Sequence, residues 1–456
     1  MINGKVSHWW HQLGEQKLRP SLPGDTSCDV AIVGAGYTGM WTAYYLKKAQ
    51  PNLNVVVIEQ QHAGYGASGR NGGWLTNSIT GGRQQYVKAY GKDVAERFQK
   101  TMNETVDEVI RVTKAEGINA DIKKGGEFNV AYTPAQERRI REFAKFEQSW
   151  KNTDLELLER DAAIAKINVA GTRAAVWYPH AARLHPAKLA DGLAKTVEGM
   201  GVTIYEGTTV TEIQPHKLLT SHGTVQAEYI VRATEGFTAN LKGLKRLWLP
   251  MNSSLIVTEP LAQQVWDELN WSEGEVLGDF AHVYMYAQHT ADDRIAFGGR
   301  GVPYRFRSRT DNDGTTQAVT AKTLNDLMVR FFPAVRGAEI DHLWSGVLGV
   351  PRDWSATVGL DRKTNIAWGG GYVGTGVTAT NLAGRTITDL ILGNQSDIVT
   401  LPWVNHRVRK WEPEPLRWIA TKALYSAYGI ADKSEYKGRE KTSPIAHIAD
   451  VITGKR

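Results

Sequence analysis

Short apolar runs alternate with longer amphipathic segments in the first part of the chain. Residues 29–33 (DVAIV) and 55–59 (VVVIE) are the apolar runs. Between them, Met40, Ala43 and Tyr44 repeat at helical spacing. A continuous apolar run flanked by helices is typical of a parallel strand that is covered on both faces. The pattern therefore predicts a parallel sheet beginning near residue 29.

The same alternation returns twice further along the chain. An amphipathic segment at 186–200 precedes an apolar run at 228–234, and residues 365–393 read as a strand, a glycine loop and a helix. Strand-like alternation fills 125–132 and much of 246–340. The pattern predicts an α/β fold (α+β overall) in which a Rossmann-like domain is interrupted by a second, mostly antiparallel β domain built from insertions.

These boundaries can be placed approximately. We assign residues 1–90, 184–243 and 341–400 to the nucleotide-binding domain. Residues 91–183 and 244–340 form the second domain, which also includes helical segments at 90–116, 133–150 and 318–332. Residues 401–456 form a basic, Trp-containing extension.

Charge changes this picture little. The 456 residues carry 54 Lys and Arg against 48 Asp and Glu, a net charge of +6, and most of the excess lies in the C-terminal extension. A basic tail can bind nucleic acid or anionic lipid, but these charges are dispersed. We interpret the extension as a solvated surface and expect no nucleic-acid partner.

Cysteine usage and the N-terminus bear on location. The single cysteine, Cys28, excludes an intrachain disulfide and an all-cysteine metal site. Residues 1–16 contain no apolar signal-peptide core, and no stretch approaches the roughly 18 apolar residues of a spanning helix. We therefore expect a cytoplasmic protein with no membrane span and no metal.

The sequence GAGYTG follows the first apolar run and opens a helix. Gly34 permits a tight turn, Gly36 lets a pyrophosphate approach the backbone, and Gly39 lets helix and strand pack closely. The free N–H groups of the helix start favour phosphate. Glu59 ends the next strand, where it can accept hydrogen bonds from a ribose, so FAD or NAD fits better than NADP.

Two further glycine-rich stretches accompany this motif. The first, GYGASGRNGGW (64–74), places Ser68, Arg70 and Asn71 where they can meet phosphate or the polar edge of a ring, although a flexible loop is also consistent with it. The second, GGGYVGTGV (369–377), precedes a helix. Its N–H groups can stabilise negative charge on a cofactor, although an ordinary strand–helix turn would look the same.

Several segments together resemble one family. They are DVAIVGAGYTGMWTAYYL, GASGRNGG, HPAKLADGLAK, GVTIYEGTTVTEI, YIVRATEGFT, RIAFGGRG and GGGYVGTGVTATNLAGR. The chain resembles the D-amino-acid-oxidase-type flavoproteins, and within them the gamma-glutamylputrescine oxidase-like branch. The resemblance extends from about residue 8 to about residue 420. It implies FAD as cofactor and the oxidation of C–N bonds.

The resemblance also implies which residues bind FAD. The ADP half lies against the first glycine turn, the pyrophosphate and flavin follow the 64–74 stretch, and the second glycine loop meets the pyrimidine edge of the flavin. The expected cofactor-binding residues are Gly34, Gly36, Tyr37, Thr38, Gly39, Glu59, Gln60, Ser68, Arg70, Asn71, Gly72, Gly73, Thr209, Val210, Thr234, Gly236, Gly374, Thr375, Gly376 and Val377.

The chain departs from the family pattern in informative places. Related enzymes link the flavin to a late cysteine, whereas Cys28 lies on the first strand, so we expect non-covalent FAD. Ala296 stands where relatives carry a lysine that helps oxygen react, which leaves oxygen or an electron carrier as acceptor. Thr378 stands where related enzymes carry a lysine that binds a substrate carboxylate. Glu235 stands where related enzymes often have Asn.

Amine oxidation by a flavin requires mainly that the protein position the substrate correctly beside the cofactor. A neutral primary or secondary amine gives a hydride to flavin N5, and the imine hydrolyses to an aldehyde or keto product and an amine. Period-two alternation puts His282, Tyr284 and Tyr286 on one face, where they form an aromatic wall for the amine or ordinary sheet packing. We select Tyr284, Tyr286, Arg300 and Trp344 as catalytic candidates.

Two other functions remain open. A NAD-dependent Rossmann dehydrogenase accounts for Gly34 to Glu59 but leaves the other two glycine stretches without a role. A non-catalytic, flavin-bearing subunit of an assembly would use the Trp-rich tail to dock a partner. A flavin spectrum separates the first alternative, and flavin reduction by an amine separates the second.

Overall fold

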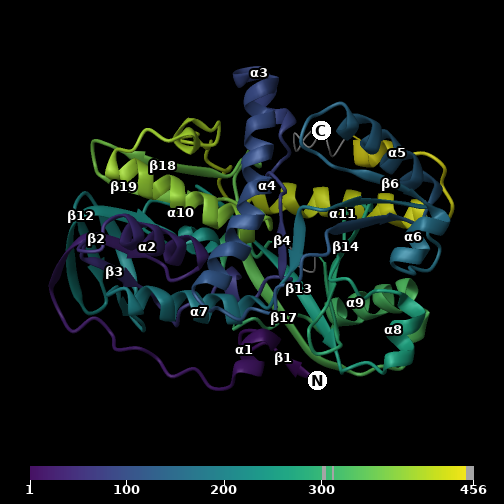
Figure 1. The fold of residues 1–456 in the computed structure, drawn as a ribbon, viewed down its shortest axis with the longest axis horizontal. Coiled ribbons are helices and arrows are strands. Elements are labelled where there is room, and N and C mark those ends of the chain that lie inside the picture. The colour runs from purple at the N-terminus through teal and green to yellow at the C-terminus, as the bar shows by residue number, and fades with distance from the viewer. Residues whose placement is uncertain (300–303, 311–312, 448–456) are drawn as a thin grey trace.

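A computed structural model describes residues 1–299, 304–310 and 313–447. Two large sheets lie side by side in it (Figure 1). The first has the strand order β10-β11-β12-β2-β3-β9; β19 joins it by pairing with β12, and β18 pairs with β19. Its strands are β2 (Thr26–Val33), β3 (Val55–Ile58), β9 (Thr203–Tyr205), β10 (Val210–Gln214), β11 (Lys217–Thr220), β12 (Gly223–Arg232), β18 (Thr357–Asp361) and β19 (Ile366–Gly370).

The centre of the first sheet is parallel, as its apolar runs predict. β2 pairs in parallel with β3 and β12, β3 with β9, and β12 with β19. One face packs on helices α2 (Tyr37–Ala49) and α10 (Gly376–Leu392), and the other packs against residues of the β10–β11 hairpin and the start of β12. Both faces of β2 and β3 are thus covered, which explains their unbroken hydrophobicity.

The second sheet has the order β1-β17-β13-β16-β15-β14-β5-β7-β6. Its pairs are antiparallel except β1 with β17 and β14 with β5. Its strands are β1 (Ile2–Asn3), β5 (Glu127–Ala131), β6 (Glu156–Glu159), β7 (Ala174–Tyr178), β13 (Leu249–Thr258), β14 (Val276–Asp279), β15 (Tyr286–His289), β16 (Ile295–Gly299) and β17 (Ile340–Val350). A short ribbon joins β4 (Trp74–Thr76) to β8 (Ala181–Arg183).

The two sheets draw their strands from different parts of the chain, and the domain boundaries given above remain a prediction. The first sheet draws its strands from the three ranges assigned to the nucleotide-binding domain. β1 and β17 also fall within those ranges, yet both belong to the second sheet. β17 does so because it pairs along its length with β13, from Val350 opposite Leu249 to Ile340 opposite Thr258.

Most long helices follow the predicted amphipathic segments. They are α4 (Lys92–Ala115), α5 (Pro134–Gln148), α7 (Pro186–Gly199) and α9 (Ala318–Phe331), and shorter ones are α1 (His8–Leu13), α3 (Gln84–Tyr90), α6 (Arg160–Lys166) and α8 (Gln263–Leu269). The 3-10 turns are η1 (Ala67–Gly69), η2 (Glu235–Asn240), η3 (Phe306–Ser308), η4 (Pro333–Val335) and η5 (Asp397–Thr400).

The C-terminal extension is not merely solvated surface. It contains α11 (Leu416–Tyr436), the yellow helix in Figure 1, which lies beside the second sheet. Tyr428, Ala431, Asp432 and Glu435 are buried there. In the part of the chain that the structure describes, no helix is both long enough and apolar enough to cross a bilayer.

Candidate active site

The first cavity, of about 530 Å³, opens where β2, β3 and α2 meet. Its floor is the glycine turn. A methyl group on Gly34 would lie 2.7 Å from the carbonyl oxygen of Ala233, and Gly34 has φ +103°. A methyl group on Gly39 would lie 2.1 Å from the carbonyl oxygen of Gly34. Only glycine fits at these two places, because they are a left-handed turn and a close helix–strand contact.

The start of α2 faces this cavity. Gly36 is its N-cap, no side chain caps it, and no acidic residue lies in its first turn. Gly36, Tyr37 and Thr38 line the cavity, and the Tyr37 N–H donates to Ser68 Oγ at 2.8 Å. Uncapped N–H groups at a helix start attract phosphate, so this end of the cavity fits a dinucleotide pyrophosphate.

Glu59 lies at the same end, on the cavity wall after β3. Its carboxylate accepts the N–H groups of Ala35 at 2.8 Å and Gln61 at 3.0 Å. Burial raises the pKa of Glu59, and these N–H donors oppose the shift. A carboxylate beside the glycine turn retains acceptor capacity for ribose hydroxyls, and so the residues present fit the adenosine half of FAD.

The 64–74 stretch continues the wall, but its polar side chains mainly organise the loop itself. Arg70 is 1% exposed, its Nε donates to the Tyr65 carbonyl at 2.7 Å, and its guanidinium lies 4.3 Å from the centroid of the Tyr65 ring. Asn71 Nδ2 donates to the Ser68 carbonyl at 2.8 Å, and Asn71 Oδ1 accepts the Gly73 N–H at 2.8 Å. The Arg–Asn pair therefore fixes the backbone that borders both cavities.

Two indoles hold this backbone from outside the cavities. Trp9 of α1 donates its Nε1–H to the Asn71 carbonyl at 2.9 Å. Trp344 of β17 donates to the Arg70 carbonyl at 2.9 Å. The structure therefore corrects the expectation for Trp344: it is fully buried and absent from both cavity walls, so it positions the loop and does not form a substrate wall.

A second, larger cavity of about 1010 Å³ adjoins the first. Residues that line both cavities are Ala67, Asn71, Leu348, Gly374 and Val377. The N-terminus of α10 points to this junction, and Thr375, its N-cap, provides no side-chain cap. The positive end of a 17-residue helix therefore faces the junction, where it favours a partner that gains negative charge.

The expected cofactor residues fall into three groups. Those that line the first cavity are Gly34, Gly36, Tyr37, Thr38, Glu59, Gln60, Ser68, Asn71, Thr209, Val210, Thr234, Gly374, Gly376 and Val377. Arg70, Gly72 and Thr375 line the second cavity. Gly39, Gly73 and Gly236 line neither, because their bare backbones pack against other chain segments.

The second cavity also contains the remaining substrate-side candidates. His282, Tyr284 and Tyr286 line it, although only Tyr286 lies in a strand, so they do not share a face through strand alternation as expected. The Tyr286 ring packs against Gly72, where a methyl group would lie 2.7 Å away, and its hydroxyl lies 2.8 Å from Ser253 Oγ. Arg300 lies outside the described residues.

Buried carboxyl groups form part of the same wall. Burial raises the pKa of Asp279 to about 7, although Met285 N–H and Tyr132 Oη–H both donate to it. Asp279 is not among the residues expected from the sequence, because nothing in its local pattern distinguishes it. Its position on β14 facing the cavity is set by pairing with β5 and β15.

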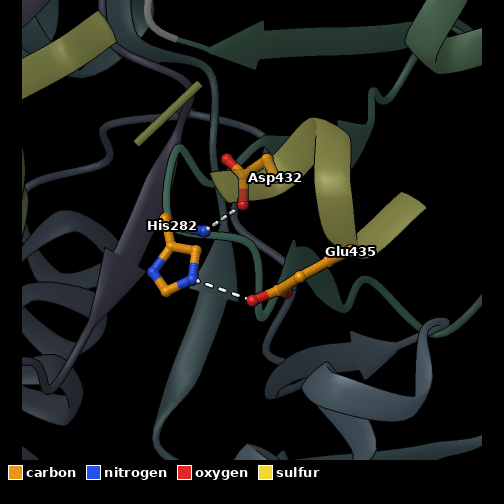
Figure 2. Close-up of side chains that lie close together, drawn as sticks. All are labelled: His282, Asp432 and Glu435. Carbon is orange, nitrogen blue, oxygen red and sulfur yellow. Dashed lines mark hydrogen bonds and ion pairs between the residues drawn. The ribbon is translucent and has the colours of Figure 1, made fainter. Parts of the chain in front are cut away.

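His282, Asp432 and Glu435 cluster where α11 meets this wall (Figure 2). Their spacing resembles a metal site, but the carboxylates are already engaged. Asp432 accepts the N–H groups of His282 and Val283, each at 2.9 Å. Glu435 accepts His282 Nε2 at 3.1 Å and a two-point ion pair from Arg139 at 2.7 and 2.8 Å. The cluster therefore fastens α11 to the loop before β15.

Residues that sequence reasoning missed complete the first cavity. Tyr65, Gln61, Phe237, Leu348 and Tyr372 all line it. Tyr372 Oη lies 3.0 Å from Thr38 Oγ1, which connects the second glycine loop to the start of α2. Both Tyr65 and Tyr372 lie inside the glycine-rich stretches. Their place in these stretches is the sequence feature that could have identified them as cavity residues.

Comparison with known proteins agrees with this geometry. A family model described as FAD dependent oxidoreductase (DAO) matches residues 29–390. The chain is 33% identical over 374 residues to "Gamma-glutamylputrescine oxidoreductase" of Escherichia coli (strain K12), covering 81% of this chain and 84% of that protein. It is 28% identical to "Probable oxidoreductase OrdL" of Haemophilus influenzae, over 85% of this chain and 88% of that protein.

Solved structures show the same fold. Glycine oxidase from Bacillus cereus superposes with a TM-score of 0.68 at 19% identity, covering 83% of this chain and 99% of that one. L-proline dehydrogenase from P. horikoshii gives a TM-score of 0.67 at 19% identity, covering 84% and 96%. The expected family and fold class are confirmed. The chain belongs to the DAO family of FAD dependent oxidoreductases.

Proposed function

We propose that this FAD-dependent oxidoreductase oxidises a C–N bond of a primary or secondary amine at the junction of its two cavities. The observation that carries the proposal is the second cavity, which joins the cofactor cavity and contains aromatic rings and buried carboxyl groups. Aromatic faces and carboxylates both attract ammonium groups. The relatives, a gamma-glutamylputrescine oxidoreductase and a glycine oxidase, support a nitrogen-bearing substrate.

The cavity's own cations do not oppose this assignment. Arg83 pairs with Glu147 at 2.6 Å, and Arg139 pairs with Glu435. Arg70, which also lines this cavity, donates its Nε–H to the Tyr65 carbonyl at 2.7 Å. Thr378, at the position of a carboxylate-binding lysine in related enzymes, is fully buried and supplies no charge. The described part of the wall therefore favours an amine over a small amino acid held by its carboxylate.

In this proposal the two sheets have different roles. The strands and glycine turns of the first sheet hold FAD, and the second sheet provides the substrate wall. Bound FAD supplies the acceptor for the hydride that leaves the carbon next to nitrogen. The chain's own residues orient that carbon: Tyr286 packs on Gly72 at the junction, and the loop fastened by Asp432 places Tyr284 beside it.

We further propose that FAD is held without a covalent bond. Cys28, the one cysteine, lies on β2, lines neither cavity, and has its pKa raised to about 12 mainly by burial. Electrons then pass to oxygen or to a carrier. Ala296 is buried on β16 and provides no positive charge at this position to assist the reaction of reduced flavin with oxygen. An electron carrier should therefore be tested as the acceptor alongside oxygen.

The test is an anaerobic substrate screen with the FAD-loaded protein. Primary and secondary alkylamines, small amino acids, alcohols and NADH are each added, and the visible flavin absorbance is followed. Loss of absorbance with amines, accompanied by an aldehyde product, supports the proposal. Reduction only by NADH or alcohols contradicts it. A bound flavin that none of these compounds reduces favours the non-catalytic subunit. Oxygen consumption on re-aeration distinguishes an oxidase from a dehydrogenase.

A further inference from the structure

The second cavity is larger than a small amine requires. Its volume of about 1010 Å³ lies at the upper end of ligand pockets, which are roughly 300–1,000 Å³. Among the described residues, four carboxyl groups line it, on Glu127, Glu142, Glu147 and Asp279. Their partners distinguish them from one another.

Three of the four carboxyl groups are already paired, hydrogen-bonded or exposed to water. Glu147 pairs with Arg83, and Glu142 is exposed to water. Asp279 accepts hydrogen bonds from a backbone N–H and a tyrosine hydroxyl. None of these three carboxyl groups requires a ligand to explain it.

Glu127 on β5 differs. It is partly buried, and among the described residues its one hydrogen-bond donor is Asn129 Nδ2, at 2.8 Å from Oε1. No Lys, Arg or His in the described chain forms an ion pair with it. Burial raises its pKa, with only the Asn129 bond opposing the shift. A carboxyl group on a cavity wall is free to bind a cationic ligand when the protein supplies no cation for it, and Glu127 has no cationic partner among the described residues.

The register of the sheet places Glu127 away from the reacting end. Tyr286, at the junction, pairs with Gly278, and Gly278 pairs with Asn129. Two strand spacings, about 10 Å, therefore separate Tyr286 from Asn129. Glu127 lies two residues further along β5 and faces the same side as Asn129.

Aromatic side chains occupy the interval. Trp74 lies over Gly278, where a methyl group would be 3.2 Å from the indole. Tyr178 on β7 pairs with Glu127 across the sheet and lines the same cavity. A path with aromatic walls, which begins at the junction and ends at an uncompensated carboxyl group, suits an apolar chain with a positive charge at its far end.

We propose that Glu127 binds a second, cationic nitrogen of the substrate, so that the preferred substrates are amines with another positive charge about 12 Å from the oxidised carbon. This inference rests on the proposed amine oxidation and names its substrate class. Asn129 holds one oxygen of Glu127 in place, and the other oxygen receives the distal ammonium. The first amine then lies at the junction beside Tyr286.

The test compares α,ω-diaminoalkanes with monoalkylamines of the same chain length on the holoenzyme, over a series of lengths. We expect kcat/KM to favour the diamine by about 10- to 100-fold at the best length, as one charge-assisted hydrogen bond provides. Glu127→Gln should reduce the diamine-to-monoamine ratio towards one, and Glu127→Asp should restore part of it. Glu156→Gln, an exposed change on strand β6 of the same sheet, is the matched control and should keep the wild-type ratio.

The outcomes separate the two proposals. Equal use of diamines and monoamines by the wild-type enzyme overturns the role of Glu127 and leaves amine oxidation intact. So does a Glu127→Gln variant that loses activity on both amines by the same factor. If no amine reduces the flavin, the proposed function itself fails. The wild-type comparison needs no variant, so poor folding of Glu127→Gln does not prevent the test.

Discussion

Glu235 Oε2 accepts the N–H of Gly371 at 2.8 Å, which joins two turns that are 136 residues apart in the chain. Its Oε1 accepts the N–H groups of Gly349 and Tyr372 at 3.1 and 3.2 Å. Burial raises the pKa of Glu235 to about 7 against the effect of these three donors. One carboxyl group thus ties η2 to β17 and to the second glycine loop, which gives a structural reason for an acid where related enzymes often have Asn.

We expect Glu235→Ala to weaken both the fold and FAD binding. Three N–H groups would lose their acceptor, and each buried, unsatisfied donor costs about 1–3 kcal/mol. Local movement and entering water will replace part of these hydrogen bonds. We therefore expect the free energy of unfolding to fall by about 2–4 kcal/mol. Chemical denaturation and an FAD titration measure the two effects. Glu228→Ala, an exposed change within β12, should change neither.

Glu59→Gln should raise the Kd for FAD by about 10- to 100-fold, because a neutral amide replaces the charged acceptor of the ribose hydroxyls. Quenching of flavin fluorescence during titration of the FAD-free protein measures this. Glu15→Gln, at an exposed N-terminal position, is the control for the loss of one charge. An unchanged Kd in Glu59→Gln would mean that the cofactor does not contact this residue.

Trp344→Phe should loosen the 64–74 stretch without abolishing the fold. The change removes the indole donor of the Arg70 carbonyl, which costs about 1–3 kcal/mol if that carbonyl stays buried. We expect weaker FAD binding in addition to lower stability. Trp266→Phe is a matched control: Trp266 is also buried, but its indole nitrogen has no hydrogen-bond partner and it lines neither cavity. Equal effects on FAD binding would contradict a positioning role for Trp344.

Asp279→Asn should flatten the pH dependence of stability between about pH 4 and 7. The unfolded chain releases this proton near pH 4, whereas burial keeps it on the folded protein up to about pH 7. The folded state therefore binds the extra proton, and stability falls as pH rises through this window, by at most about 1.4 kcal/mol per pH unit. Unfolding free energies of both proteins across this range measure the difference, which should grow in favour of Asn towards pH 7.

Asp432→Ala should release the loop before β15 from α11. The N–H groups of His282 and Val283 would lose their acceptor, so we expect faster amide hydrogen exchange at both positions and a higher KM for the amine. Asp397→Ala, on the exposed turn η5, should leave exchange at these two positions unchanged. Unaltered exchange in Asp432→Ala would show that other contacts hold the loop.

The sequence predicts the cofactor half of the site better than the substrate half, for a physical reason. The glycine turn and Glu59 lie at the ends of adjacent parallel strands, so a local pattern also fixes their position in space. Asp279 and Glu127 become neighbours of the cavity only through pairing between β14 and β5, whose sequence separation is large. The pairing of Trp344 with Arg70 spans 274 residues and leaves no local signal.

The C-terminal extension shows the same limit. Its charged residues predict a solvated surface, yet Asp432 and Glu435 of α11 are buried because His282, Val283 and Arg139 supply their partners. Composition alone predicts an exposed segment, because it does not reveal the partners that allow these charged residues to be buried. The period-two reading of His282, Tyr284 and Tyr286 fails similarly, since contacts with α11 hold the first part of that segment out of the strand.

A crystal structure of the protein loaded with FAD tests the central claim most directly, namely that FAD fills the first cavity with its flavin ring at the junction, and that the second cavity receives the substrate. We predict the adenosine beside Gly34 and Glu59, and the flavin ring, without a covalent bond to the chain, among Ala67, Asn71, Leu348, Gly374 and Val377, with one face open to the second cavity. A flavin ring located elsewhere, or one whose reactive face is closed off from the second cavity, would contradict the account.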